Sequence, residues 1–202
     1  RYRYIEQLSR SKNNGLIKII TGLRRSGKSF LLKKLFHQHL LDEGVREDHI
    51  LVIDMESRKN REFKNPDYLL DWVEKMMIET YYIIIDEVQE VEDFVEVLSS
   101  LSVTEGADVY VTGSNSRFLS SDLVTEFRGR GDEIHVWPLS FKEFMTVYDG
   151  SKEDGWAEYR LYGGLPQLLT QVGDEKKADF LRRLYRTVYL RDIYERNNIE
   201  LS

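Results

Sequence analysis

The stretch IITGLRRSGKS, residues 19–29, decides the fold of this chain. It leads from an apolar, strand-like run into the spacing G-x-x-x-x-G-K-[ST], and an amphipathic helical pattern begins directly after it. Glycines at positions 22 and 27 let the backbone bend so that successive N–H groups point inward at an anion. A helix that begins at Lys28 adds the positive end of its dipole. A strand, a glycine turn and a helix in this order predict a binding site for the phosphates of a nucleotide.

The side chains of this stretch have expected roles at such a site. Lys28 supplies a mobile positive charge for the β- and γ-phosphates, and the Ser29 hydroxyl is the expected Mg²⁺ ligand. The residues expected to surround the nucleotide are Gly22, Leu23, Arg24, Arg25, Ser26, Gly27, Lys28, Ser29 and Phe30. The alternative is a chance match in a glycine turn, but such a match seldom falls between a strand and a helix.

Apolar runs alternate with helical patterns outward from this stretch. Strands are expected over residues 16–21, 50–54, 81–86, 107–112 and 133–137. Helices are expected over residues 28–43, from 65 onward, and over 92–101 and 119–127. This alternation predicts an α/β fold of the P-loop nucleotide-hydrolase type, with three α/β/α layers and a five-stranded, mostly parallel sheet with right-handed crossovers.

The pattern becomes all-helical from Pro138 onward. Ser140 and Glu143 have the spacing of a capping box, which marks a helix start. Further helices are expected over residues 154–162, over 166–172 and from 174 onward. We therefore expect a nucleotide-binding core over residues 1–138 and, over 139–202, a small helical lid or the start of a C-terminal helical domain.

Two carboxylates follow the apolar strand at 81–86. Asp86 and Glu87 lie at its C-terminal end, and in an open α/β sheet ligands bind at that edge. We expect Asp86 to hold Mg²⁺, directly or through water, together with Ser29. Glu87 is then placed to orient and deprotonate an attacking water. The alternative is a pair of solvated acids that begin a loop.

Two later segments carry further candidates. Asn115 follows the strand at 107–112 and could hydrogen-bond the γ-phosphate or the water, as could Ser114, although both are also ordinary turn residues. The run FRGRG, residues 127–131, places two arginines on a glycine turn. The planar guanidinium of Arg130 suits the charge spread of phosphoryl transfer, and a surface turn with salt bridges is the other interpretation.

Composition excludes several classes of protein. The 202 residues are 41% hydrophobic and 32% charged, with a net charge of −6, which argues against nucleic-acid binding by the whole surface. There is no cysteine, and the four histidines have no metal-ligand spacing. We found no apolar run long enough to span a membrane and no signal peptide, so we expect a cytoplasmic protein. The first residue is not Met, which suggests a fragment.

The order of these motifs resembles the AAA+ class of P-loop ATPases. More narrowly, it is similar to the bacterial and archaeal "ATP-binding protein" family, whose AAA domain precedes a C-terminal domain of unknown function. The marks of the resemblance are IKIITGLRRSGKS (17–29), IDEVQ (85–89), TGSNS (112–116), GR (129–130), PLSFKEF (138–144), YGGLP (162–166) and LRDIYERN (190–197).

The resemblance implies a bound ATP or ADP with Mg²⁺, and it assigns further residues. Asn115 matches the sensor-one position, and Arg130 matches the arginine that acts as a finger. Pro166 lies in a run that resembles the G-x-P element that touches the adenine region from the lid, and the other interpretation of Pro166 is a proline that starts a helix. The family's C-terminal domain would begin or continue near Ser202. That domain is expected to carry the partner specificity, whether the partner is another copy of the chain or a different protein.

Several functions remain open on the sequence. One is ATP hydrolysis to ADP, coupled to movement of the lid and of a partner; another is a nucleotide-dependent switch with negligible turnover. A DNA-associated motor is a further alternative, because the helix after residue 174 is rich in Lys and Arg, although intervening acids favour a solvated helix. A GTPase is disfavoured by the absence of an Asn-Lys-x-Asp run, and a transporter ATPase by the absence of a Leu-Ser-Gly-Gly signature.

Overall fold

The computed structural model describes residues 1–77, 81–113 and 131–186. The chain divides into two compact units. The sheet unit comprises Tyr2–Thr21 and Lys28–His135, and the helical unit comprises Arg1, Gly22–Gly27 and Val136–Ser202. The phosphate loop predicted over residues 22–29 therefore begins in the helical unit and ends in the sheet unit. Within the described residues, no helix is both long and apolar enough to cross a membrane.

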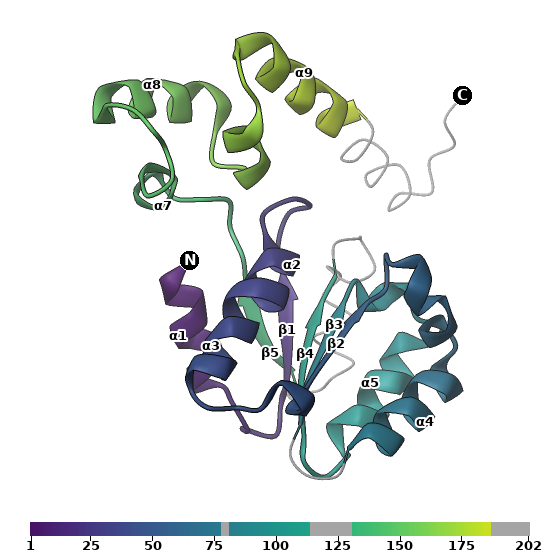
Figure 1. Cartoon of the computed structure of the whole chain (residues 1–202). Helices are drawn as coiled ribbons and strands as arrows, with labels where there is room; N and C mark the ends of the chain where they lie inside the picture. Colours follow the sequence, from purple (N-terminus) through teal and green to yellow (C-terminus); the bar gives the residue numbers. More distant parts are fainter. Residues whose placement is uncertain (78–80, 114–130, 187–202) are drawn as a thin grey trace, which may run out of the picture. The chain divides into compact units, whose positions relative to one another are not determined.

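A five-stranded parallel sheet forms the sheet unit, in the order β2-β3-β4-β1-β5 (Figure 1). The strands are β1 (Ile17–Thr21), β2 (Ile50–Asp54), β3 (Tyr81–Asp86), β4 (Ala107–Thr112) and β5 (Gly131–His135). The α/β class and the sheet are confirmed. The fifth strand, predicted over residues 133–137, lies two residues earlier, at Gly131–His135. Pairing with β1 runs from Ile17 opposite Gly131 to Thr21 opposite His135, and it ends there because β1 itself ends before the glycine turn.

Helices cover both faces of this sheet, as Figure 1 shows. On one face lie α1 (Tyr2–Arg10) and a continuous helical run of α2 (Lys28–Phe30), the π-helical segment η1 (Leu31–Phe36) and α3 (His37–Asp42). On the other lie α4 (Pro66–Met76) and α5 (Phe94–Ser102). Short 3₁₀ turns connect these elements: η2 (Glu47–His49), η3 (Arg58–Lys64) and η4 (Val88–Glu90). The predicted helix over 28–43 is thus one helix with a π segment inside it.

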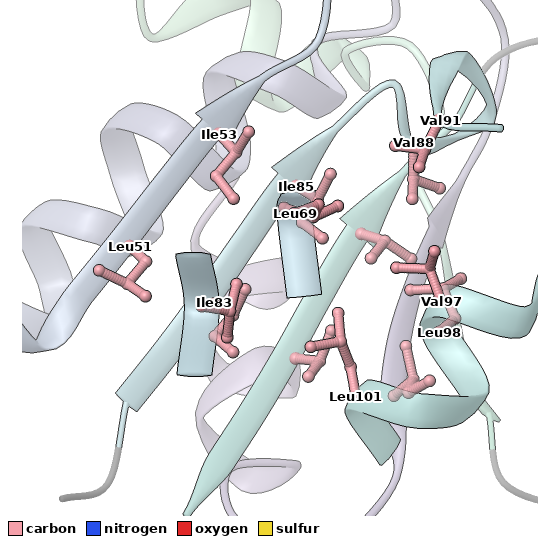
Figure 2. Packing of buried hydrophobic residues seen from close by; sticks show 14 of the residues in the cluster. Leu51, Ile53, Leu69, Ile83, Ile85, Val88, Val91, Val97, Leu98 and Leu101 are labelled. Carbon is pink, nitrogen blue, oxygen red and sulfur yellow. The ribbon is translucent and has the colours of Figure 1, made fainter. Parts of the chain in front are cut away.

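The main core packs β1–β4 against α4 and α5. Figure 2 shows members of this core: Leu51 and Ile53 of β2, Ile83 and Ile85 of β3, and helix side chains such as Leu69 of α4 and Leu98 of α5. β3 is buried at every position from Tyr81 to Asp86, as expected for a strand covered on both faces. A carboxylate at the end of such a strand is consequently held in a fixed place.

One buried polar network lies within the sheet. Lys18 of β1 forms an ion pair with Asp108 of β4, and both are buried. Asp108 also accepts hydrogen bonds from the Tyr110 hydroxyl at 2.8 Å and from the Asn13 N–H at 3.0 Å. Burial, and then the negative charge of Asp108, raise the pKa of Tyr110. Each charge is paired and hydrogen-bonded, which offsets much of the cost of removing it from water.

In its described residues the helical unit contains the short helices α7 (Phe141–Met145), α8 (Lys152–Tyr162), η5 (Pro166–Thr170) and α9 (Asp174–Leu184). The predicted capping box is present: the Ser140 hydroxyl accepts a hydrogen bond from the Glu143 N–H, and the Glu143 carboxylate accepts one from the Ser140 N–H. The Leu139 N–H donates to the Gly164 carbonyl at 2.7 Å, and a Cβ on Gly164 would lie 2.1 Å from the Leu139 oxygen. The PLSF and YGGLP runs therefore pack directly against each other.

Candidate nucleotide site

The backbone of the phosphate loop explains its glycines. Gly22 has φ of 133° and Gly27 has φ of 96°, values that favour glycine, and Arg25 also lies in the left-handed region with φ of 65°. A Cβ on Gly22 would stand 2.2 Å from the Val136 carbonyl oxygen, well inside van der Waals contact. Two independent features therefore require glycine at position 22: its backbone φ and this close approach.

Two polar side chains of the loop are almost fully buried. Ser26 has no exposed surface, and its hydroxyl has no hydrogen-bond partner among the described residues. Lys28 is 4% exposed and begins α2. A buried hydroxyl without an acceptor is costly, so a phosphate oxygen that accepts its hydrogen bond would stabilise it. The Ser26 hydroxyl is thus a donor of the kind that a phosphate oxygen would satisfy.

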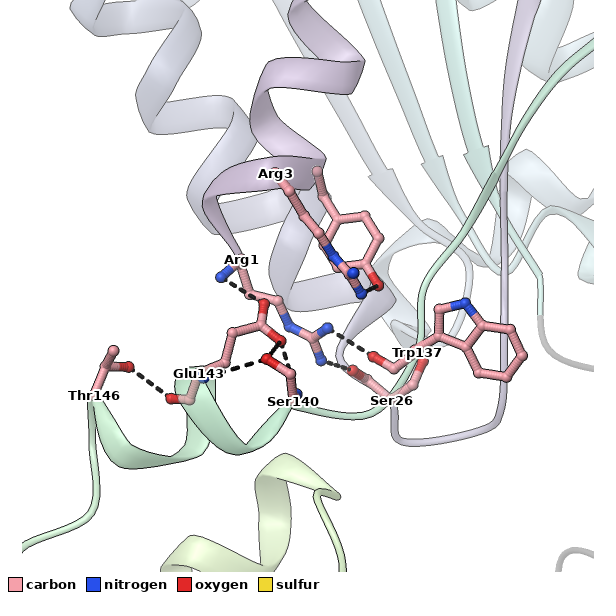
Figure 3. A network of polar contacts seen from close by, with 8 residues as sticks. Arg1, Arg3, Ser26, Trp137, Ser140, Glu143 and Thr146 are labelled. Atoms are coloured by element: carbon pink, nitrogen blue, oxygen red, sulfur yellow. Dashed lines mark hydrogen bonds and ion pairs between the residues drawn. The ribbon is translucent and has the colours of Figure 1, made fainter. Parts of the chain in front are cut away.

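Other parts of the helical unit hold the loop from outside. The Arg1 guanidinium donates to the Ser26 carbonyl at 2.5 Å and to the Trp137 carbonyl at 2.6 Å (Figure 3). The Arg25 guanidinium donates to Gln167 Oε1 at 3.0 Å and lies 5.3 Å from the centre of the Phe180 ring. The side chain of Arg25, predicted among the nucleotide-binding residues, is therefore directed toward η5 and α9.

The predicted lid residue Pro166 lies near the loop. A Cβ on Gly27 would be 3.6 Å from Pro166 Cγ and 3.5 Å from Arg1 Nη2. Both distances are ordinary van der Waals contacts. Contact of Pro166 with an adenine ring stays a prediction.

The two predicted carboxylates lie at the end of β3, in the sheet unit. Asp86 is 1% exposed, and its Oδ1 accepts a hydrogen bond from the Thr112 hydroxyl at 2.6 Å. The same hydroxyl accepts the Glu87 N–H at 3.0 Å. Glu87 has φ of 58°, and its Oε2 accepts from Gln89 Nε2 at 2.6 Å. Thr112 of β4 thus fixes both acids at once, one through its carboxylate and one through its backbone.

A lysine connects the helix after the loop to these acids. Lys33 Nζ is 2.6 Å from Asp86 Oδ2 and 2.7 Å from Asp54 Oδ2. Lys33 lies one helical turn beyond Ser29, so the helical run that starts at the loop passes the carboxyl end of β3. The structure therefore brings the helix that carries Lys28 and Ser29 to the edge of the sheet that carries Asp86.

Negative charge dominates this edge of the sheet. The pKa of Glu56 is raised, first by partial removal of its carboxyl group from water and then by the negative charges of Glu87, Asp86 and Asp54. Burial opposes the charged form of Lys33, but hydrogen bonds and charge interactions with Asp54 and Asp86 outweigh it, so its pKa is raised. Such an environment attracts cations.

The predicted magnesium ligands fit this environment. Among the described residues, no group of three or more His, Cys, Asp or Glu side chains has the geometry of a metal site. Mg²⁺ in nucleotide sites uses one or two protein oxygens together with phosphates and waters. The Ser29 hydroxyl and the Asp86 carboxylate supply that number and type of ligand.

Sequence reasoning missed three side chains at this site. Thr112 ends β4, the strand beside β3, and its hydroxyl at that position was a usable sequence signal for a polar group at the site. Asp54 ends β2 directly opposite Asp86 in the register, and Lys33 follows the loop by one turn. Two predicted residues, Asn115 and Arg130, lie outside the described part of the chain, as does Ser114.

The fold and the site geometry define a P-loop protein of the AAA+ class. The family model described as "AAA domain" matches residues 14–145, more than half of the chain. The chain belongs to this AAA domain family, a class of nucleotide-binding ATPase domains.

Similar proteins are known from bacteria and archaea. The chain is 33% identical over 209 residues to an uncharacterized protein of Haemophilus influenzae, covering 99% of this chain and 52% of that protein. It is 27% identical over 199 residues to an uncharacterized protein of Methanocaldococcus jannaschii, covering 91% of this chain and 43% of that protein. The chain thus spans about half the length of the curated relatives it matches.

A solved structure shares the fold. The Aeropyrum pernix ORC1 protein in complex with DNA superposes with a TM-score of 0.52 at 14% identity, over 95% of this chain and 60% of that one. At this identity the likeness concerns the fold alone.

The close approach at Gly22 leads to a stability prediction. Gly44 also has a positive φ, of 90°, but a Cβ there meets nothing within 4 Å. We expect Gly44→Ala to lower the free energy of unfolding by about 1–2 kcal/mol through backbone strain alone. Gly22→Ala should cost at least about 2 kcal/mol more, because its methyl group would overlap the Val136 carbonyl. Urea unfolding of both variants measures the difference, and equal losses would show that the close approach is unimportant.

Proposed function

We propose that this AAA domain binds ATP with Mg²⁺, hydrolyses it to ADP and couples the nucleotide state to its helical segment. The observation that carries the proposal is the pair Asp86 and Glu87 at the carboxyl end of β3, both fixed by Thr112. A carboxylate that is 1% exposed, followed by a second acid in a left-handed backbone conformation, is unusual for a solvated loop. The orphaned Ser26 hydroxyl and the buried Lys28 supply matching groups for phosphates.

Each residue has a distinct part in this reaction. The backbone N–H groups of residues 22–29 and the Lys28 ammonium hold the phosphates and offset their negative charge. Asp86 and Ser29 would hold Mg²⁺, which neutralises charge on the β- and γ-phosphates. Glu87 accepts a proton from the water that attacks the γ-phosphorus, while the bond from that phosphorus to the bridging oxygen of ADP breaks.

A second function, a switch with slow turnover, has its own support. Gln89 donates to Glu87 Oε2 at 2.6 Å, so one oxygen of the proposed base is already engaged by the protein. That oxygen must give up its hydrogen bond from Gln89 before it can take a proton from an attacking water. In this alternative the nucleotide changes the conformation, and hydrolysis is rare.

The Glu87→Gln variant distinguishes the two functions. We expect it to bind ATP as the unchanged chain does, since the amide has the same shape, but to hydrolyse ATP at least about 100-fold more slowly, because the amide cannot take the proton. Phosphate release measures the rate and calorimetry measures the binding. Glu90→Gln is the matched control, since Glu90 lies three residues on in an exposed ion pair with Lys64.

Two outcomes would go against hydrolysis as the function. A Glu87→Gln variant with the full rate would remove Glu87 from the chemistry. A wild-type chain that binds ATP with negligible release of phosphate would support the switch instead.

Coupling to the helical segment is supported by the contacts of Arg25. Its guanidinium bonds Gln167 of η5 and lies over Phe180 of α9, while its backbone forms part of the phosphate loop. Nucleotide binding that reorders the loop would therefore act on η5 and α9 through this side chain. The coupling free energy is expected to be about 1 kcal/mol, the size of one hydrogen bond.

Hydrogen exchange tests this coupling. In the wild-type chain, a non-hydrolysable ATP analogue should change the exchange of amides in residues 166–180. Arg25→Ala should lose most of that change while it still binds the analogue. Gln167→Ala should lose it as well, because it removes the partner of the same hydrogen bond. Gln171→Ala, which removes a side chain just beyond η5 that bonds the Thr170 hydroxyl, serves as the control. An undiminished response in Arg25→Ala would contradict the coupling.

Other parts of the proposal concern residues outside the described part of the chain. We retain Asn115 as the side chain that senses the γ-phosphate and Arg130 as the finger, acting on its own or a neighbouring subunit. A homo-oligomer, a partner protein and a cytoplasmic location belong to the proposal as well. Action on DNA stays an alternative, because the similar ORC1 structure is a complex with DNA but the likeness to it concerns only the fold.

A further inference from the structure

Lys33 bridges two strand ends within the candidate site. Its Nζ contacts Oδ2 of Asp86 at 2.6 Å and Oδ2 of Asp54 at 2.7 Å, and these two aspartates lie opposite each other in the register of β2 and β3. The Lys33 side chain is 23% exposed, and that of Asp86 is 1% exposed. The nearly buried carboxylate therefore has its Oδ1 bonded by Thr112 and its Oδ2 bonded by a cation of the protein itself.

The backbone around Lys33 is also unusual. It lies in η1, a π-helical segment inside an otherwise α-helical run. Such segments are rare and occur often at functional sites, because the wider turn redirects the side chains that it carries. Lys34, the next residue, is exposed, so only one of the two adjacent lysines faces the carboxylates.

We propose that Lys33 is an internal counterion of the metal site, which shares Asp86 with Mg²⁺ and yields it to the ion by moving onto Asp54. This inference rests on the proposed function, because it concerns the magnesium ligand of that site. Asp54 makes the exchange feasible, since Lys33 already bonds it and keeps a charged partner when Asp86 turns to the metal. Lys33 would in this way keep the carboxylates from repelling one another and would set the Mg²⁺ concentration at which the site fills.

The counterion role and a purely structural role predict opposite changes in metal affinity when Lys33 is removed. A lysine that only stabilises the site would, when removed, leave Asp86 misplaced and weaken metal binding. A lysine that competes for Asp86 would, when removed, leave a more negative site and strengthen it. For a divalent ion and a unit charge about 5 Å apart in water-like surroundings, Coulomb's law gives an effect of about tenfold in affinity.

Binding of Mn²⁺, followed by the loss of the free-ion EPR signal, tests the inference directly. The titration uses Mn²⁺ as the probe, with the complete chain saturated by a non-hydrolysable ATP analogue. We expect Lys33→Met to bind Mn²⁺ about tenfold more tightly than the wild type. Lys34→Met removes the same charge one residue away and should change the Kd by less than about twofold. Asp54→Asn should weaken Mn²⁺ binding, and this effect should shrink when Lys33 is also Met, because the two side chains act as a pair.

The outcomes separate this inference from the proposed function. A wild-type chain that binds neither Mn²⁺ nor the analogue would overturn the proposed function and the inference with it. A wild-type chain that binds both, with Lys33→Met unchanged or weaker, would overturn the inference alone. Circular dichroism confirms the fold of each variant, and Lys33→Gln takes the place of Lys33→Met if the apolar side chain disturbs η1.

Discussion

Parallel pairing of β3 with β2 and β4 determines where the polar groups of the candidate site lie. Because all three strands run the same way, their carboxyl ends meet at one edge of the sheet, and Asp54, Asp86 and Thr112 come together there. No long-range loop is needed to assemble them. β3 is buried over its whole length, so the acids at its end have a rigid support. The chemistry proposed for the site thus depends on a register that the hydrophobic core maintains.

Concentrated negative charge at this edge has a cost that the protein offsets locally. Carboxylates that lie close together repel, and removal from water makes the repulsion stronger. Thr112 and Lys33 reduce the cost by bonding the two oxygens of Asp86. The buried Lys18 and Asp108 pair, at other positions of β1 and β4, applies the same principle within the sheet. Paired charge in the core serves structure in one place, whereas at the edge of the sheet it can serve a ligand.

Much of the fold followed from the sequence because it depends on local patterns. The continuous apolar run at 81–86 and the capping box at Ser140 are signals within a few residues, and both elements formed as expected. The end of β5 was misplaced because it depends on where its neighbour β1 stops. The π segment at Leu31–Phe36 could not be predicted either, since its apolar spacing also fits an ordinary α-helix.

The candidate site likewise has parts that local sequence patterns predict and parts that depend on neighbouring elements. Motif spacing located the loop and the two acids, since these are continuous in the chain. It could not locate the groups that act on them from other elements: Thr112 from β4, Asp54 from β2, or the contacts of Arg25 with Gln167 and Phe180. Such partners are selected by strand order and packing, and nothing in the spacing of the motifs records either.

We propose that residues 22–29 hold a nucleotide through Lys28 and the loop backbone. Calorimetric titration of ATP with Mg²⁺ into the wild-type chain and into Lys28→Ala tests it most directly. We predict saturable binding of one nucleotide per chain by the wild type, and affinity at least about tenfold weaker, or about 1.4 kcal/mol, in the folded variant. Equal affinities in the two chains would contradict it.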